Sequence, residues 1–238
     1  MISMVIPTYN RDTLLLRNFE RLSSLTKPDE ILVIDDGGDD MTEFACEYAQ
    51  RLGLCVRYIY NHNPGWSNRC LATNIGIRQA SGDHILGNDA ELWFETDVVA
   101  QLKAARELDS YNTLCAEVMR SEPYHGAPPE KYIDGPGGYV SFYRREWLLE
   151  LGGWDENMPG PNGYDDCDIH TRLAYIGHPQ VKVPGSVIRH HWHEQYEYPP
   201  EDLLSGGKNP NQEYWENKPL PEELIANRDH EWGQIRHR

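Results

Sequence analysis

The sequence contains no long hydrophobic segment, and this absence excludes one class of protein. The longest apolar runs, such as Met4–Pro7 and Ile31–Ile34, extend over only a few residues. A helix that crosses a bilayer needs about 20 consecutive apolar residues, so we expect no membrane span. The N-terminus leads directly into a strand-like stretch, with no charged region and no cleavage site of a secretory signal. A cytoplasmic location is therefore expected.

Basic residues and cysteines are also scarce. The chain has 22 Lys and Arg residues against 38 Asp and Glu residues, which gives a formal net charge of −16. Nucleic-acid binding usually requires a basic face, so no nucleic-acid partner is expected. The five cysteines are an odd number without C-x-x-C spacing. This pattern favours reduced, packed thiols over a disulfide framework or a zinc site.

The chain is long enough to bury one substantial core. It has 238 residues, of which 39% are hydrophobic and 25% are charged, as in ordinary soluble domains. In the first half, strand-like and helix-like segments alternate, which predicts an α/β fold with a doubly wound, mostly parallel sheet flanked by helices. The expected strands are Ile2–Thr8, Glu30–Asp36, Val56–Tyr60 and Ile85–Asn88, and the expected helices are Arg11–Leu25, Met41–Leu52 and Cys70–Ala80.

The second half predicts a smaller β piece and a tail. Glycines close two of its helices, and the segment from Glu194 onward is polar and rich in proline. We expect a domain over residues 1–193, with halves 1–92 and 93–193, and a tail or lid over 194–238 that packs on the core. The expected elements are the helices Thr96–Leu108, Arg145–Leu151 and Asp166–Ile176, the loop Ser121–Gly137, and the strands Thr113–Met119, Gly138–Tyr143, Val181–Val183 and Val187–Ile188.

Two carboxylates follow the fourth expected strand. Asp89 and Glu91 are two residues apart, so in an extended chain their side chains point to the same face. The carboxyl ends of strands are where open α/β sheets bind ligands. Paired hard oxygen ligands suit Mg²⁺ or Mn²⁺, especially an ion that also binds a diphosphate. An ordinary acidic turn is the alternative for an isolated D-x-E.

Two further polar clusters lie where other elements end or begin. The expected second strand ends in Asp35-Asp36-Gly37-Gly38, where a carboxylate can accept hydrogen bonds from a base or a ribose. Asn68-Arg69 precedes a helix, and a planar multi-donor cation near a helix N-terminus suits a diphosphate. An acidic turn and a surface arginine are the alternatives for these two clusters.

Three carboxylates in four residues enter the helix that begins near Asp166. Asp165, Asp166 and Asp168 exceed what helix capping requires, and their mutual repulsion tends to raise one pKa. A carboxylate in such a setting suits a general base. Further on, the sequence Arg189-His190-His191-Trp192-His193 follows a short strand, and one of its imidazoles can complete a metal shell that Glu91 begins.

Taken in order, these segments resemble the family 2 glycosyltransferases of the GT-A fold. The second half resembles the C-terminal region of the β-1,4-galactosyltransferases and the polypeptide N-acetylgalactosaminyltransferases. The resemblance covers residues 2 to about 193. Its segments are Ser3-Met4-Val5-Ile6-Pro7-Thr8-Tyr9-Asn10-Arg11, Ile34-Asp35-Asp36-Gly37, Ser67-Asn68-Arg69, Asn74-Ile75-Gly76, Asp89-Ala90-Glu91, Gly137-Gly138-Tyr139-Val140-Ser141, Gly152-Gly153-Trp154-Asp155-Glu156, Asp165-Asp166-Cys167-Asp168 and Val187-Ile188-Arg189-His190.

The resemblance implies a metal-dependent transfer of sugar from a nucleotide-diphosphate sugar, UDP-linked, to an acceptor hydroxyl with inversion. Mn²⁺ or Mg²⁺ is the implied cofactor, and a carbohydrate or another hydroxyl-bearing molecule is the implied acceptor. The implied roles are nucleotide-sugar binding by Pro7, Thr8, Tyr9, Asp36, Arg69 and Asp89, metal binding by Asp89, Glu91 and His190, general base catalysis by Asp166, and acceptor binding by Asp165 and Trp154.

The sequence departs from the family pattern at several positions. Glu91 replaces the second Asp of the D-x-D motif, and Val187 stands where the galactosyltransferases have a methionine ligand. A protein that binds sugar nucleotides or carbohydrates without turnover is therefore one alternative. A nucleotidyltransferase is another, although the glycine-rich basic loop typical of that class does not follow the first strand. A glycosidase also needs two carboxylates, but it gives no reason for Asp36 and Arg69 at the ends of strands.

Overall fold

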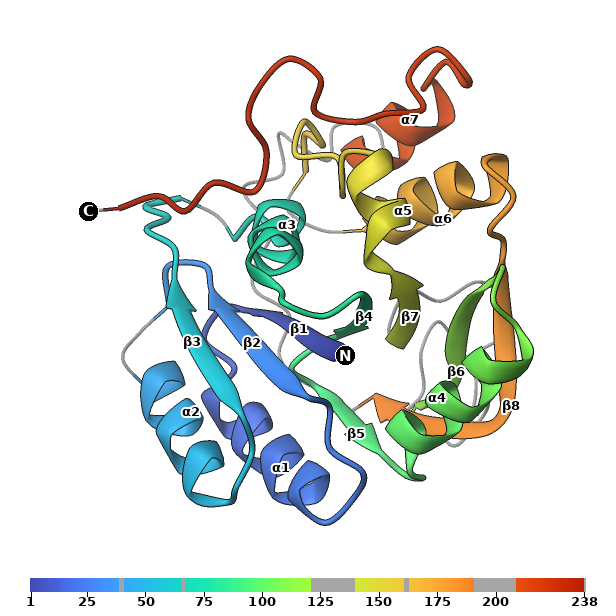
Figure 1. Ribbon diagram of the computed structural model, residues 1–238. Helices are drawn as coiled ribbons and strands as arrows, with labels where there is room; N and C mark the ends of the chain where they lie inside the picture. Colours follow the sequence, from blue (N-terminus) through green and yellow to red (C-terminus); the bar gives the residue numbers. More distant parts are fainter. Residues whose placement is uncertain (39–40, 66, 121–139, 161–162, 191–208, 238) are drawn as a thin grey trace.

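The computed structural model describes residues 1–38, 41–65, 67–120, 140–160, 163–190 and 209–237 (Figure 1). In these residues one eight-stranded sheet has the strand order β3-β2-β1-β4-β7-β6-β8-β5. Helices cover both faces of the sheet, and the sheet is curled. The expected α/β class is confirmed.

The first half of the chain forms the parallel part of the sheet. Strands β3, β2, β1 and β4 run parallel, with helices as connections, so that β1, β2 and β4 end at one edge. The expected elements are confirmed to within about two residues at each end. The elements are β1 (Ile2–Thr8), α1 (Asp12–Ser23), β2 (Glu30–Asp35), α2 (Met41–Arg51), β3 (Val56–Tyr60), α3 (Arg69–Gln79) and β4 (His84–Asn88).

The second half adds strands of both directions. Strand β7 is antiparallel to β4 and β6, β8 is parallel to β6, and β5 is antiparallel to β8. The elements are β5 (Leu92–Phe94), α4 (Val98–Leu108), β6 (Thr113–Arg120), β7 (Val140–Arg144), α5 (Arg145–Glu150), α6 (Asp165–Tyr175), β8 (Gln180–His190) and α7 (Pro210–Glu216).

One expectation for the second half needs correction, and two elements were not predicted. The two short β pieces are one strand, β8, which continues through Pro184 and Gly185 with a register shift opposite β6. Strand β5 and helix α7 did not stand out in the sequence, because one is only three residues long and the other lies in a polar segment. The expected loop 121–137 lies outside the described residues.

Two apolar clusters pack on opposite faces of the sheet. One contains side chains of α1, α2 and α4, and the other contains side chains of α3, α5 and α6. Helix α3 approaches the sheet very closely, since a Cβ at Gly76 would lie 2.3 Å from Cγ1 of Val5. This contact fixes the start of α3 relative to the edge where β1, β2 and β4 end.

Residues 209–237 pack against the second cluster through Tyr214, Leu224, Trp232 and Ile235. The segment then returns toward β3 (Figure 1). The amide of Ala226 donates to the carbonyl of Leu151, and the carbonyl of Arg236 accepts from the amide of His62. The division into halves and a tail stays a prediction, but this segment is tightly bound to the rest of the structure.

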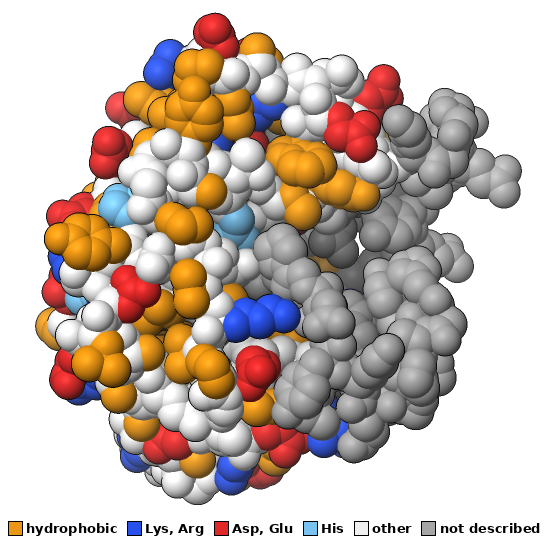
Figure 2. Space-filling model, turned by 90° about the vertical axis from the view of Figure 1, so that its right-hand side faces the viewer, with side chains coloured by type: hydrophobic (Ala, Val, Ile, Leu, Met, Phe, Trp, Pro, Cys, Tyr) orange, Lys and Arg blue, Asp and Glu red, His pale blue; other side chains and the backbone are white. Residues whose placement is uncertain are grey.

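The face on the right of Figure 1 carries dispersed charge. Carboxylates lie between separate groups of apolar side chains on the described part of this face (Figure 2). Within the described ranges, no helix is both long enough and apolar enough to cross a bilayer.

Candidate active site

The candidate residues meet at the edge where the parallel strands end. Thr8 closes β1 opposite Asp35 of β2, and the amide of Asp36 donates to the carbonyl of Thr8 over 3.0 Å. Asp89 follows β4 directly, and Arg69 and Asp165 begin α3 and α6. Parallel strands bring their carboxyl ends together, which explains why distant segments of sequence converge here.

Asp36 is completely buried and organises the loop before α3. Its carboxylate accepts hydrogen bonds from Nδ2 of Asn61 at 2.7 Å, from Nδ2 of Asn63 at 2.9 Å and from the amide of Asn68. Asn68 in turn caps α3, because its side chain accepts from the amide of Leu71 at 3.0 Å. Asp36 therefore places Arg69, and its expected contact with a nucleoside base stays a prediction.

Arg69 joins the two sides of the site. Its Nη2 donates to Oδ1 of Asp89 at 2.9 Å, and its Nη1 donates to Asp165 and, at 3.1 Å, to Oδ1 of Asp166. Burial lowers the pKa of this guanidinium, but the charges of the three carboxylates raise it by more. The pKa of Arg69 therefore lies above its ordinary value. One side chain thus connects the end of β4 with the start of α6.

Three carboxylates share the single positive charge of Arg69. Burial, with the charges of Glu91 and Asp166, raises the pKa of Asp89 to about 7, although Arg69 opposes this effect. Burial and Asp166 also raise the pKa of Asp165. Such shifts indicate that the site favours an additional cation or proton beside these groups.

Glu91 and His190, two of the three donors expected for a metal, lie close together. Pairing of β5 with β8 places Leu92 opposite His190, and Oε1 of Glu91 lies 3.8 Å from Nε2 of His190. A carboxylate oxygen and an imidazole nitrogen suit a divalent transition metal. In the described ranges, no group of three or more such ligands is arranged around one point. The pair fits an ion whose remaining ligands come from a diphosphate, and His191 and His193 lie outside the described residues.

The other candidates for donor binding lie at the same edge. Thr8 is 5% exposed, and its Oγ1 has no hydrogen-bond partner among the described residues. An unpaired buried hydroxyl is costly, which suits a group that waits for a ligand. Pro7 and Tyr9 flank it and are partly exposed.

The start of α6 distinguishes its carboxylates by exposure. The side chain of Asp166 is 25% exposed, whereas that of Asp165 is 5% exposed and that of Asp168 is 2% exposed. Only Asp166 of these three is open to a substrate. Tyr164 precedes them, and its ring lies against Trp215 of α7 with the ring centroids 5.7 Å apart.

Trp154 lies in the core instead of an open pocket. It is 3% exposed, and its ring meets Tyr143 edge-on at a centroid distance of 5.6 Å. Stacking on an acceptor would need a ring face that this packing covers, so the structure corrects the expected position of Trp154. Its expected contact with the acceptor is not supported.

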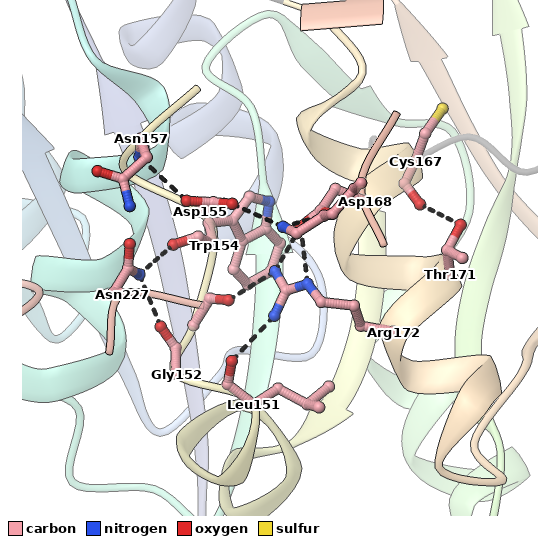
Figure 3. A network of polar contacts seen from close by, with 12 residues as sticks. Leu151, Gly152, Trp154, Asp155, Asn157, Cys167, Asp168, Thr171, Arg172 and Asn227 are labelled. Carbon is pink, nitrogen blue, oxygen red and sulfur yellow. Dashed lines mark hydrogen bonds and ion pairs between the residues drawn. The ribbon is translucent and has the colours of Figure 1, made fainter. Parts of the chain in front are cut away.

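The sequence interpretation missed a second group of charges behind α6 (Figure 3). Asp155, Asp168, Arg172 and Lys218 form ion pairs in the interior. The spacing of Asp168 and Arg172, four residues apart on a helix, was a usable signal. Lys218 gave none, because it lies in a polar segment with weak periodicity.

Comparison with known proteins identifies the family. The model of the family described as "Glycosyl transferase family 2" matches residues 3–149. The chain belongs to glycosyl transferase family 2. This match covers the parallel half of the sheet and continues through β7 and most of α5, so a glycosyltransferase domain is present. The family match disfavours the glycosidase and nucleotidyltransferase alternatives.

Related sequences are similarly named. An uncharacterized glycosyltransferase of Bacillus subtilis, YwdF, is 28% identical over 191 residues, which are 73% of this chain and 68% of that protein. The undecaprenyl-phosphate 4-deoxy-4-formamido-L-arabinose transferase of Serratia proteamaculans is 34% identical over 113 residues, which are 44% of this chain and 34% of that protein. Against the Streptococcus pneumoniae glycosyltransferase GlyA, the match spans only 14% of the relative.

Solved structures confirm the GT-A fold. TarS of S. aureus matches with a TM-score of 0.65 and 17% identity, over 80% of this chain and 60% of that chain. GalNAc-T7, in a crystal structure with UDP, GalNAc and Mn²⁺, matches with a TM-score of 0.69 and 19% identity. That match covers 90% of this chain and 47% of GalNAc-T7.

Proposed function

We propose that this chain transfers a sugar from a UDP-linked donor to an acceptor hydroxyl, with inversion at the anomeric carbon. The bridge formed by Arg69 carries the proposal. It ties Asp89, at the nucleotide-binding edge of the sheet, to Asp165 and Asp166 at the start of α6. A donor bound at the strand ends would therefore lie next to a partly exposed carboxylate.

The donor site is assigned to the edge formed by β1, β2 and β4. Thr8 has a buried hydroxyl without a partner among the described residues, and Arg69 presents a fork of donors suited to a diphosphate. Crystal structures of TarS with UDP and with UDP-GlcNAc support a uridine donor by analogy of fold. The mannosyltransferase PcManGT of Pyrobaculum calidifontis was solved with GDP-Man and Mn²⁺, so guanosine is the competing choice.

Glu91 and His190, with Asp89 nearby, would hold a divalent ion, Mn²⁺ or Mg²⁺. Oε1 of Glu91 already lies 3.8 Å from Nε2 of His190, and the raised pKa of Asp89 indicates surplus negative charge at the site. When bound, such an ion neutralises the charge that develops on the leaving diphosphate. Glu91 directly precedes β5, and the pairing of Leu92 with His190 brings the two donors to the same place.

Asp166 is assigned as the general base. Its carboxylate accepts from Arg69 at 3.1 Å, which orients it, and it is the most exposed carboxylate of the turn. The acceptor oxygen attacks the anomeric carbon, the bond from that carbon to the diphosphate breaks, and the diphosphate keeps the electron pair. The hydroxyl proton passes to Asp166. Asp165 is buried and bound to Arg69, so we assign it to supporting the acceptor side.

The experiment combines donor binding with turnover. Purified protein is mixed with UDP-, GDP- and dTDP-linked sugars, each with Mn²⁺ or with EDTA, and both the melting temperature and the nucleoside diphosphate released are measured. A UDP-sugar should raise the melting temperature only with metal, because a ligand of the folded state stabilises it by mass action. Release of UDP should accompany this shift.

Asp166→Asn is the matched variant. It should keep the metal-dependent shift and lose release of UDP, because the amide cannot take a proton. Normal release by this variant would remove Asp166 from the role of base. A metal-dependent shift without release in the wild type, with several sugar acceptors tried, would instead identify a protein that binds nucleotide sugars without turnover.

A further inference from the structure

The first turn of α6 concentrates negative charge and has no side-chain cap. Tyr164 precedes it with a left-handed φ of 62°, and its side chain makes no capping hydrogen bond. Asp165, Asp166 and Asp168 follow within the turn, where carboxylates repel one another. The helix dipole offsets only part of this repulsion. The position of the turn must therefore depend on cations from other segments.

Arg69 supplies one cation, on the side of the turn that faces the donor edge. Asp168 lies roughly 200° around the helix from Asp166, because each residue of an α-helix advances by about 100°. It points into the interior instead, where its carboxylate accepts from Nε of Arg172 at 2.7 Å (Figure 3). The same carboxylate accepts from Nζ of Lys218 at 2.8 Å. The turn is bound by cations on both sides.

Lys218 differs from Arg172 because it comes from outside α6. Its side chain is 3% exposed, and its Nζ also donates to Oδ2 of Asp155 at 2.6 Å. Tyr214 of α7 donates to the same oxygen at 2.9 Å. One ammonium group thus ties α6, the loop after α5 and the segment that follows α7.

The four charges form a balanced set in the interior. Two carboxylates, of Asp155 and Asp168, face two cations, of Arg172 and Lys218, and Arg172 also donates to the carbonyls of Leu151 and Gly153. Burial raises the pKa of Asp155, but the hydrogen bond and charge of Lys218 reverse this effect and lower it. Without Lys218, Asp155 would lose the cation it pairs with in the interior, and Asp168 would keep only Arg172. Leaving a buried carboxylate without its cation is strongly unfavourable.

We propose that Lys218 is a positioning residue for the transfer reaction, which fixes the first turn of α6 so that Asp166 faces the donor. This inference rests on the proposed function. Lys218 itself contacts neither the donor edge nor Asp166 in the contacts that the described residues make. It acts through Asp168, two residues beyond the base, and it makes residues 209–237 part of the catalytic domain.

The test uses the full chain and four variants. Lys218→Met removes the cation, and Lys218→Arg restores one. The double variant Asp155→Asn with Lys218→Met removes one charge of each sign, so that the interior stays balanced while the tie to Asp168 is lost. Lys27→Met is the control of equal charge change, because Lys27 is exposed and donates only to the carbonyl of Gly53 among the described contacts.

Three kinds of measurement are made on each variant. The first is kcat and KM for UDP release from the UDP-sugar that the wild type turns over, with water as acceptor. The second is amide hydrogen exchange of residues 163–170. The third is the melting temperature. Exchange needs no donor, so it reports on the turn even if the proposed function is wrong.

Loss of the ion pair between Lys218 and Asp168 should lower kcat by about tenfold or more, both in Lys218→Met and in the double variant. The reason is that a small misplacement of a reacting group slows the reaction strongly. The donor KM should stay within about twofold, because the donor edge is untouched. Exchange in residues 163–170 should rise, and Lys218→Arg should recover most of the activity. Lys27→Met should behave as the wild type.

If Lys218→Met fails to fold, the double variant still tests the proposal. A cooperatively folded double variant with wild-type kcat and unchanged exchange would overturn the proposal. Absence of UDP release from every donor in the wild type would overturn the proposed function instead. Faster exchange in the double variant would then still show that Lys218 fixes the turn.

Discussion

The two sides of the candidate site are built by different forces. The proposed donor side lies at the ends of β1, β2 and β4, and the proposed acceptor side lies at the start of α6. On the donor side, Asp36 binds amide groups of Asn61, Asn63 and Asn68, all within 32 positions of it, on a regular parallel sheet. On the acceptor side, ion pairs join segments far apart in sequence, such as Arg69 with Asp166 and Lys218 with Asp168. The donor side resembles a fixed scaffold, and the acceptor side depends on the balance of buried charge.

The comparison predicts that Arg69, which belongs to both sides, is the most sensitive position. Arg69→Met would leave Asp89, Asp165 and Asp166 without their shared cation. Breaking a buried ion pair by removing one partner costs about 3–5 kcal/mol, and we expect a loss of that size in the free energy of unfolding. Urea denaturation measures it, and release of UDP should be lost as well.

Arg69→Lys is the matched control for this prediction. Its ammonium keeps the charge but cannot donate to Asp89 and Asp166 in a planar fork. It should recover part of the stability and little of the activity. If Arg69→Met were as stable as the wild type, the two sides would not be coupled through this residue.

A smaller loss is expected on the donor side alone. Asp36→Asn keeps the shape but presents an amide donor to groups that are themselves donors. Hydrogen bonds to charged groups contribute about 1.5–3 kcal/mol, so the free energy of unfolding should fall by about this amount. The affinity for the nucleotide should also fall, because the loop before Arg69 loosens. Exchange in residues 163–170 should rise less than in Arg69→Met, because Arg172 and Lys218 still bind Asp168. An equal rise in both variants would contradict the separation of the two sides.

The acceptor side should also be sensitive to acid through His170. This residue is 6% exposed, and its Nε2 lies 2.9 Å from the hydroxyl of Tyr143. Burial and the charge of Arg69 lower its pKa to about 4, while Asp165 opposes them. The unfolded chain therefore takes up the proton first as the pH falls. The contribution of neutral His170 is complete above the ordinary histidine pKa and declines from there toward pH 4.

Linkage sets the size of this effect at about 2 kcal/mol between pH 8 and pH 5. Other groups titrate in the same pH range, so the pH dependence of the wild type is compared with that of a variant without this imidazole. Urea unfolding of the wild type and of His170→Gln at both pH values should show a pH dependence smaller by about this amount in the variant. Equal pH dependence in both proteins would mean that His170 does not resist protonation in the fold.

The comparison also explains how much the sequence could predict. The parallel strands and their helices were predicted closely, because each has a local apolar pattern between turn residues. The family resemblance assigned Asp89, Arg69 and Asp166 to one active site, but it did not predict that Arg69 binds both carboxylates. In contrast, Lys218 and the burial of Trp154 depend on which distant segments pack together, and no local pattern carries that information. Strand β8 was divided in the prediction because Pro184 and Gly185 usually end a strand.

The smallest expected effect on stability concerns Thr8, the residue on the donor side with a hydroxyl that has no partner among the described residues. Thr8→Val keeps the β-branched shape and removes only that polar group. Replacing an unsatisfied buried group by an apolar one of the same shape is nearly neutral or stabilising, so the melting temperature without ligand should be equal or slightly higher. If the hydroxyl binds the donor, the stabilisation by UDP and Mn²⁺ should shrink at the same time. An unchanged shift with the nucleotide would place Thr8 in the scaffold and not in the binding site.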